Sequence, residues 1–250
     1  MSTGLHFVSQ RWRQWLRWAA LGLAFVLFVP VMQVGCVRVF DPPTTGPRVA
    51  RWLGGRISGR VQPPVSYQKV PLDDVSGAFL LSLWVTEDGT YYNHHGFNWT
   101  QIRHAWEESR ATGRPPRGAS TITQQCARSL FLWQRRSWLR KGLEAYYTFW
   151  MERLLSKERI LELYVNVIET GNGVYGLEAG ARHHYGIPAS ELDWEQAAML
   201  TAMLPTPRRS DPNAPSPYLQ ERQTTILSRL ASSYGVYADR RYPMVKGKRP

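Results

Sequence analysis

The sequence predicts a mainly α-helical fold behind one N-terminal transmembrane helix. Three observations support this prediction. An almost unbroken apolar run, residues 18–37, lies close to the N-terminus. Beyond residue 75, apolar residues recur at helical spacing between cap and stop residues. No set of alternating polar and apolar residues, the pattern of half-buried strands, competes with the helical one.

The apolar run is interrupted only by Gln33. Its 20 residues, at roughly 1.5 Å each, are just long enough to cross a bilayer core. Three arginines precede it: Arg11, Arg13 and Arg17. Because the cytoplasmic flank of a membrane helix is the one enriched in cations, residues 1–17 are predicted to be cytoplasmic and the chain beyond the anchor extracytoplasmic. We therefore expect a single-pass protein of the plasma (inner) membrane.

Two alternatives to an anchor remain open. A cleaved signal peptide would need a small-x-small cleavage site, which does not follow the run, and a shorter apolar segment. A lipoprotein cysteine at Cys36 would leave Gln33 where an apolar residue is expected. Either alternative would still export the remainder of the chain, so we expect no nucleic-acid partner.

The remainder divides into three parts. Residues 38–75 are rich in Pro and Gly and are expected to form a connector with little regular structure. Residues 76–238 form the predicted folded domain, and residues 239–250 a short basic tail. In the domain, Asn98 is expected to cap a helix that turns Ile102, Ala105 and Trp106 toward a core. Further helix starts are predicted at Ser120, Ser137, Ser156, Asp193 and Ser216, and stops at Gly113, Gly171, Pro205 and Gly235.

The formal net charge is +12, and much of it lies in one window, residues 109–143. This window holds eight cations and no carboxylate, and is bracketed by Glu108 and Glu144. Like charges repel one another, so such a window is best tolerated where a polyanion sits among the cations. The cations are Arg110, Arg114, Arg117, Arg128, Arg135, Arg136, Arg140 and Lys141.

A candidate general base lies just before this window. Glu87 and Asp88 stand where an apolar helix gives way to a loop rich in Gly, Asn and His. Loops on rigid scaffolds are where catalytic groups sit, and a partly desolvated carboxylate is a better proton acceptor. The alternative is an acidic pair that faces water at a helix end.

Two further patterns suit a polar ligand. Residues 118–125 supply many hydrogen-bonding groups and no charge. If Ser120 caps a helix there, the free N–H groups of its first turn would point at a nearby anion; the alternative is a plain capping segment. Glu144 lies one turn after Arg140 and Lys141, either as an ordinary ion pair or to orient them toward a ligand. The histidines show no metal-ligand spacing, so we predict no metal site and no cofactor.

Four segments in order resemble the motifs of the peptidoglycan glycosyltransferases, glycosyltransferase family 51, and especially its monofunctional biosynthetic transglycosylases. They are Glu87-Asp88 through Tyr91, His94 and Gly96; Gly118 to Gln125; Arg140-Lys141-x-x-Glu144; and Lys157 to Asn166. The resemblance implies a compact, lysozyme-like helical glycosyltransferase domain. The implied activity is polymerisation of lipid II outside the plasma membrane, with inversion at C1 of MurNAc and release of undecaprenyl diphosphate.

The same resemblance implies residue roles. Glu87 would be the general base, and Glu144 would organise the diphosphate site. The implied substrate-binding residues are Asp88, His94, Ser120, Thr121, Gln124, Gln125, Arg128, Arg136, Arg140, Lys141 and Asn166. The partners would be lipid II, the growing lipid-linked glycan and the membrane, with room for other cell-wall synthesis proteins. Since the chain ends soon after these motifs, we expect no transpeptidase domain.

The sequence departs from the family pattern at several positions, of which Arg128 matters most. It offers a planar bidentate fork where the family places the point charge of a lysine. Two other functions remain open. A lytic glycan-cleaving enzyme of lysozyme-like fold would also use a buried Glu, but it needs no diphosphate site. A non-enzymatic scaffold that binds anionic lipid would show scattered Lys, whereas Arg predominates in the window.

Overall fold

The computed structural model describes residues 3–59, 65–115 and 118–237. The predicted basic tail, residues 239–250, lies outside them, as does Arg117 of the cationic window. The chain divides into two compact units, residues 1–41 and residues 42–250.

The first unit is one helix, α1 (Thr3–Val39), with Pro30 inside it. Its segment Trp12–Val39 is long and apolar enough to cross a membrane. At 1.5 Å per residue these 28 residues extend about 42 Å, more than the roughly 30 Å of a bilayer core. The helix therefore includes the predicted span, residues 18–37, and begins well before it. Its length and composition are compatible with an anchor.

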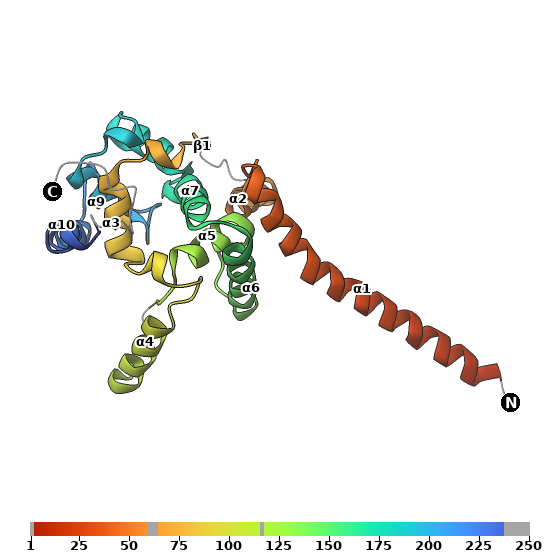
Figure 1. The fold of residues 1–250 in the computed structure, drawn as a ribbon. Coiled ribbons are helices and arrows are strands. Elements are labelled where there is room, and N and C mark those ends of the chain that lie inside the picture. Colours follow the sequence, from red (N-terminus) through yellow and green to blue (C-terminus); the bar gives the residue numbers. More distant parts are fainter. Residues whose placement is uncertain (1–2, 60–64, 116–117, 238–250) are drawn as a thin grey trace. The chain divides into compact units, whose positions relative to one another are not determined.

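The second unit is mainly helical, so the predicted fold class is confirmed (Figure 1). Its elements in order are α2 (Gly46–Ser58), β1 (Ser66–Tyr67), η1 (Leu72–Asp74), α3 (Gly77–Glu87), η2 (Tyr91–Asn93), α4 (Trp99–Thr112), α5 (Ile122–Phe131), α6 (Trp138–Leu154), α7 (Lys157–Val167), β2 (Glu169–Gly171), β3 (Val174–Tyr175), α8 (Leu177–Tyr185), η3 (Ala189–Glu191), α9 (Trp194–Met203) and α10 (Pro217–Tyr237).

The core is built around α3, an almost wholly apolar helix. Phe79, Leu80, Leu83 and Trp84 are each fully buried. α3 packs against α9 and α10, while α5 packs against α6 and α7. The half-buried C-terminal end of α3 lies beside α5, where Glu87 Oε2 accepts a hydrogen bond from Gln125 Nε2. The last residue of a buried helix is thus positioned beside a second group of helices.

Most predicted helix starts are confirmed because they depend on local hydrogen bonds. Asn98 Oδ1 accepts the Gln101 N–H, and the hydroxyls of Ser137 and Ser156 cap α6 and α7. Asp193 forms a capping box with Gln196 at the start of α9. In each case the side chain satisfies a backbone N–H that has no partner within the helix.

Several predictions about local structure were wrong. α10 continues to Tyr237, past the stop predicted at Gly235. The connector is not irregular, because α2 and β1 lie within residues 38–75. α7 ends at Val167 rather than Gly171, which lies in strand β2. These short strands form a sheet in the order β1-β3-β2, with β1 parallel and β2 antiparallel to β3. Strands of two or three residues are too short to show an alternating pattern.

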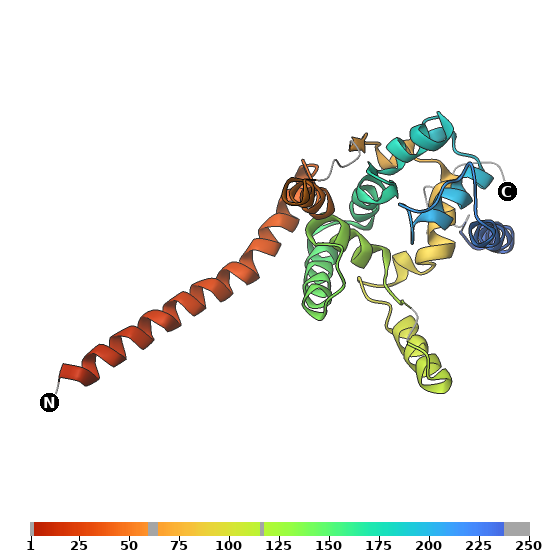
Figure 2. The same cartoon turned by 180° about the vertical axis from the view of Figure 1, so that it is seen from behind.

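Another wrong prediction concerns α4. Figure 1 and Figure 2 show this helix standing away from the other helices, and none of its residues is buried. Trp106, which we expected to face a core, is 57% exposed. Ile102 and Ala105 do lie on one side of α4, but within the described residues they are only half-buried and form no core.

The approach of α8 to β2 yields a stability prediction. A Cβ added at Gly180 would lie 2.5 Å from Thr170 Oγ1 and 2.8 Å from its Cβ, whereas one at Gly142 in α6 would meet nothing within 4 Å. Gly180→Ala is expected to lower the free energy of unfolding by about 1–3 kcal/mol through overpacking. Gly142→Ala should raise it by about 0.5–1 kcal/mol, because alanine favours helix. Thermal unfolding in detergent compares the two; equal melting temperatures would contradict the close contact.

Candidate active site

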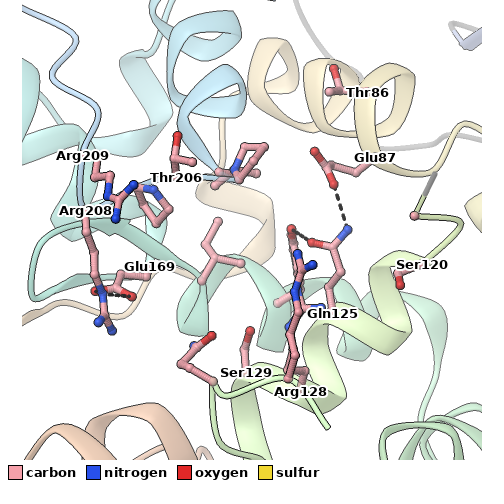
Figure 3. A pocket seen from close by; sticks show the side chains of 18 of the residues that line it. Thr86, Glu87, Ser120, Gln125, Arg128, Ser129, Glu169, Thr206, Arg208 and Arg209 are labelled. Carbon is pink, nitrogen blue, oxygen red and sulfur yellow. Dashed lines mark hydrogen bonds and ion pairs between the residues drawn. The ribbon is translucent and has the colours of Figure 1, made fainter. Parts of the chain in front are cut away.

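A cavity of about 640 Å³ lies where the end of α3 meets α5, α6, α7 and the loop after α9 (Figure 3). Of the predicted site residues, it brings together Glu87, Ser120, Gln125, Arg128, Arg136 and Arg140. The other seven, namely Asp88, His94, Thr121, Gln124, Lys141, Glu144 and Asn166, do not line it. Their contacts within the protein are described below.

Glu87 is held by a chain of hydrogen bonds at the cavity wall. Gln125 Nε2 donates to Glu87 Oε2 over 2.8 Å, and the Tyr164 hydroxyl donates to Gln125 Oε1 over 3.1 Å (Figure 3). Burial, followed by the negative charge of Glu87, raises the pKa of Tyr164 well above its usual value. The phenol therefore keeps its proton and remains a donor, which fixes the orientation of the Gln125 amide and through it the Glu87 carboxylate.

Glu144 lies beneath the cavity and joins two cations of the window. Its side chain is fully buried, with Oε2 at 3.0 Å from Arg140 Nη1 and Oε1 in contact with Lys141 Nζ. Lys141 Nζ also donates to Ser120 Oγ over 3.2 Å. One carboxylate therefore aligns both cations. Arg140 lines the cavity, and Lys141 donates a hydrogen bond to Ser120, which also lines it.

Asp88 is buried and forms its hydrogen bonds with other parts of the protein. It is 2% exposed, and it accepts hydrogen bonds from His94 Nε2 at 3.0 Å and from the Ile122 N–H at 3.0 Å. His94 Nδ1 accepts the Gly96 N–H, which assigns the proton to Nε2. The pair thus joins the loop after α3 to the first turn of α5, next to Glu87 in the sequence.

The cap of α5 differs from the expected one. Thr121, not Ser120, is the cap, and it forms a capping box with Gln124. Thr121 also donates to the Gly96 carbonyl over 2.7 Å. Thr121 accepts the Gln124 N–H and Asp88 accepts the Ile122 N–H, so two N–H groups of the first turn of α5 have partners within the protein. Ser120 is left at the cavity wall.

Asn166 is likewise occupied. Its Oδ1 accepts the Val70 N–H at 2.9 Å and its Nδ2 donates to the Val70 carbonyl at 2.8 Å. This bidentate pairing ties the segment before α3 to α7, over 96 positions of sequence. The residue is 5% exposed, so it stabilises the fold behind the cavity.

Sequence reasoning missed the wall of the cavity formed by residues 204–209 and by Glu169. Arg208 Nε donates to both oxygens of Glu169, over 2.8 and 3.0 Å. Arg209 lines the cavity and makes no ion pair within the described part of the chain. The adjacent arginines after Pro205 were the available signal, but they lie outside the carboxylate-free window.

The described residues therefore give the cavity five arginines on two sides. Arg128, Arg136 and Arg140 come from the window, and Arg208 and Arg209 from the loop after α9. Figure 3 shows Arg208 and Arg209 well separated from Glu87 and Arg128. A cavity with one carboxylate near its first cationic cluster and a second cationic cluster further away suits reactants that carry more than one anionic group. No group of three His, Cys, Asp or Glu in the described ranges could hold a metal ion.

Comparison with known proteins shows the family of this chain. The family described as Transglycosylase matches residues 55–231. The chain is 41% identical over 226 residues to the biosynthetic peptidoglycan transglycosylase of Xanthomonas campestris pv. campestris, which covers 90% of this chain and 91% of that protein. It is 38% identical over 224 residues, 90% of each chain, to that of Shewanella amazonensis. The chain therefore belongs to the biosynthetic peptidoglycan transglycosylases, a family of glycosyltransferase enzymes with a helical, lysozyme-like domain.

Proposed function

We propose that this enzyme polymerises lipid II into glycan chains at the outer face of the plasma membrane, with Glu87 as the general base. The observation that carries the proposal is the placement of Glu87, oriented by Gln125, in a cavity with five arginines among the described residues. The proposed orientation, with the N-terminus cytoplasmic, follows from the cations that precede the apolar span.

In the proposed reaction, Glu87 takes the proton from the 4-hydroxyl of the acceptor GlcNAc. The oxygen attacks C1 of the donor MurNAc from the face opposite the leaving group, forming the new glycosidic bond. The bond from C1 to the diphosphate oxygen breaks, and undecaprenyl diphosphate departs with the electron pair. A single displacement inverts the configuration at C1 and requires no covalent enzyme intermediate.

Arg128, Arg136 and Arg140 are suited to hold the donor diphosphate, with Lys141 and Glu144 behind them. Negative charge grows on the departing diphosphate as its bond to C1 breaks. Cations fixed in place before the reaction therefore stabilise the transition state more than the ground state. A lytic enzyme that cleaves a neutral sugar linkage would gain nothing from such a cluster, so the arginines favour synthesis.

The direct test is to incubate the purified full-length protein with lipid II in detergent. We expect polymer, release of undecaprenyl diphosphate, and a linkage whose anomeric configuration is opposite to that of the donor. Retention of configuration would contradict single displacement. Cleavage of preformed glycan without polymer formation would favour the lytic alternative.

The acceptor lipid II carries a diphosphate too, and we propose that Arg209 helps to bind it. That diphosphate stays intact during the reaction, so a contact with it is equally strong in the ground state and the transition state. Arg209→Ala is therefore expected to raise the apparent KM for lipid II about ten-fold, for a loss of ~1.5 kcal/mol of charge-assisted hydrogen bonding, with kcat little changed.

Arg229→Ala, at an exposed position of α10, is the matched control for the loss of one positive charge. Steady-state kinetics of both variants separate KM from kcat. An unchanged KM in Arg209→Ala, or a fall in kcat without a rise in KM, would exclude the assigned role.

A further inference from the structure

One arginine of the second cationic cluster is held by a buried carboxylate. Arg208 Nε donates to Glu169 Oε1 over 2.8 Å and to Glu169 Oε2 over 3.0 Å. Both residues line the cavity (Figure 3). The Glu169 side chain is only 9% exposed, whereas that of Arg208 is 46% exposed. The carboxylate is therefore the buried end of this ion pair, and the guanidinium is the accessible end.

Glu169 is itself fixed from two directions. It begins β2 and lies opposite Tyr175 of β3, so the sheet holds its backbone. Its Oε1 lies 3.8 Å from Nη1 of Arg51 in α2, whose side chain is 7% exposed. Arg51 Nη2 in turn donates to Asn172 Oδ1, between β2 and β3, over 3.1 Å. A buried guanidinium and a sheet thus set the position of the carboxylate that holds Arg208.

The contact with Glu169 uses only one part of the Arg208 guanidinium. This planar group has five N–H donors, and the two hydrogen bonds to Glu169 both come from Nε. Both Nη groups lie outside this contact. A pair of Nη groups can bind two oxygens of one phosphate at once. The geometry therefore orients a fork of donors on the cavity wall.

The charge at this wall remains positive after pairing. Two guanidinium groups, those of Arg51 and Arg208, share the single carboxylate of Glu169. Arg209 lines the cavity beside them. A pair that served only to stabilise the fold would need one arginine for one carboxylate. The excess of positive charge favours an anionic ligand at this end of the cavity.

We propose that Glu169 is a positioning residue for substrate binding, which holds Arg208 so that its Nη groups bind the acceptor diphosphate together with Arg209. The proposal rests on the acceptor site proposed above. A mobile arginine loses side-chain entropy when it binds a ligand. Because Glu169 already restrains Arg208, much of that entropy is lost on folding instead. The acceptor diphosphate stays intact in the reaction, so the effect belongs in KM and not in kcat.

A double-mutant cycle in the full-length protein tests this role. Arg208→Leu keeps an apolar stem and is expected to raise the apparent KM for lipid II about five- to ten-fold, through the loss of charge-assisted hydrogen bonds. Glu169→Gln should raise it about three- to five-fold, because Arg208 becomes mobile. The kcat of both variants should change little. In the Arg208→Leu background, Glu169→Gln should raise KM no further, since Glu169 acts through Arg208.

The chain offers a closely matched control pair on α8. Arg182 Nε donates to Glu178 Oε1 over 2.7 Å, and the two side chains are 48% and 7% exposed. These values are close to those of Arg208 and Glu169, but neither Arg182 nor Glu178 lines the cavity. Glu178→Gln should therefore lower the melting temperature as Glu169→Gln does, while Glu178→Gln and Arg182→Leu leave KM near that of the parent.

Three outcomes would overturn the proposal. A lower KM in Glu169→Gln would mean that the carboxylate competes with the substrate for Arg208. Independent effects of Glu169→Gln and Arg208→Leu on KM would mean that Glu169 does not act through Arg208. An equal rise of KM in Glu178→Gln would show a general effect of losing a buried ion pair.

Arg208→Lys tests the same point without changing Glu169. A lysine keeps the charge but has no fork, so it cannot pair with Glu169 and also bind two phosphate oxygens. We expect a rise of KM close to that of Arg208→Leu. A parental KM in Arg208→Lys would show that charge alone is sufficient and would contradict the positioning role.

Binding without turnover separates this inference from the proposed reaction. The affinity of each variant for fluorescent lipid II is measured by anisotropy in a Glu87→Gln, Arg136→Ala background, which blocks the proposed base and weakens the proposed donor site. We expect the same order of effects as in KM. Absence of polymer with the parent enzyme would overturn the proposed reaction and leave this measurement valid. Equal affinity of the parent background, Glu169→Gln and Arg208→Leu would overturn the positioning role alone.

Discussion

Glu87→Gln is expected to lower the rate of glycan polymerisation by about 10²–10⁴-fold, the usual contribution of a positioned general base. The amide cannot take the proton of the attacking hydroxyl at neutral pH. It can still accept the hydrogen bond from Gln125 Nε2, which now reaches Glu87 Oε2 over 2.8 Å. The geometry of the site should therefore survive, so the variant separates proton transfer from structure.

The measurement is the rate of polymer formation from lipid II, together with the melting temperature and the affinity for undecaprenyl diphosphate. Both of these last two quantities are expected to stay near those of the parent. Glu191→Gln, at an exposed position of η3, controls for the loss of one negative charge. Polymerisation by Glu87→Gln at the parental rate would remove Glu87 from the role of base.

Some of the site could be predicted from sequence because it depends on neighbours along one helix. Glu144 with Arg140 and Lys141 is such a case, since residues three and four apart share a helix face. The caps by Ser137 and Ser156 are others, because a cap hydrogen bond reaches only three residues along the chain.

Other features depend on residues far apart in sequence. The sequence did not predict that Asp88 accepts the N–H of Ile122, 34 positions away. α2 was expected to be irregular because its glycines and proline disfavour helix locally. It is helical because its inward residues are held by the domain, as Arg51 is by Asn172 across 121 positions.

The cationic wall after α9 shows the same limit. The charge pattern of the sequence indicated only the window, residues 109–143. Arg208 and Arg209 follow a different helix and do not belong to a long stretch without carboxylates. Packing of α9 on α3 brings that loop to the end of the helix that carries Glu87. A linear count of charge therefore finds one of the two cationic clusters.

Glu144→Ala tests whether the buried carboxylate organises the diphosphate site or only stabilises the fold. Arg140 is 7% exposed, and the loss of the Glu144 carboxylate would leave its buried positive charge without a partner. We expect the free energy of unfolding to fall by about 3–5 kcal/mol. The remaining folded protein should also bind undecaprenyl diphosphate more weakly, because Arg140 and Lys141 lose the carboxylate that aligns them.

Glu178→Ala is the control that separates these effects. Glu178 is also buried, pairs with Arg182 at 2.7 Å and accepts the Ala189 N–H, but it does not line the cavity. Both variants should melt at lower temperature than the parent, and at a temperature where both are folded only Glu144→Ala should lose affinity for undecaprenyl diphosphate. Unchanged affinity in Glu144→Ala would mean that Arg140 and Lys141 are held in place by Ser137, Ser120 and the helix itself. In that case Arg140 and Lys141 alone would be sufficient to bind the diphosphate, and the Glu144 carboxylate would only compensate their positive charge within the fold.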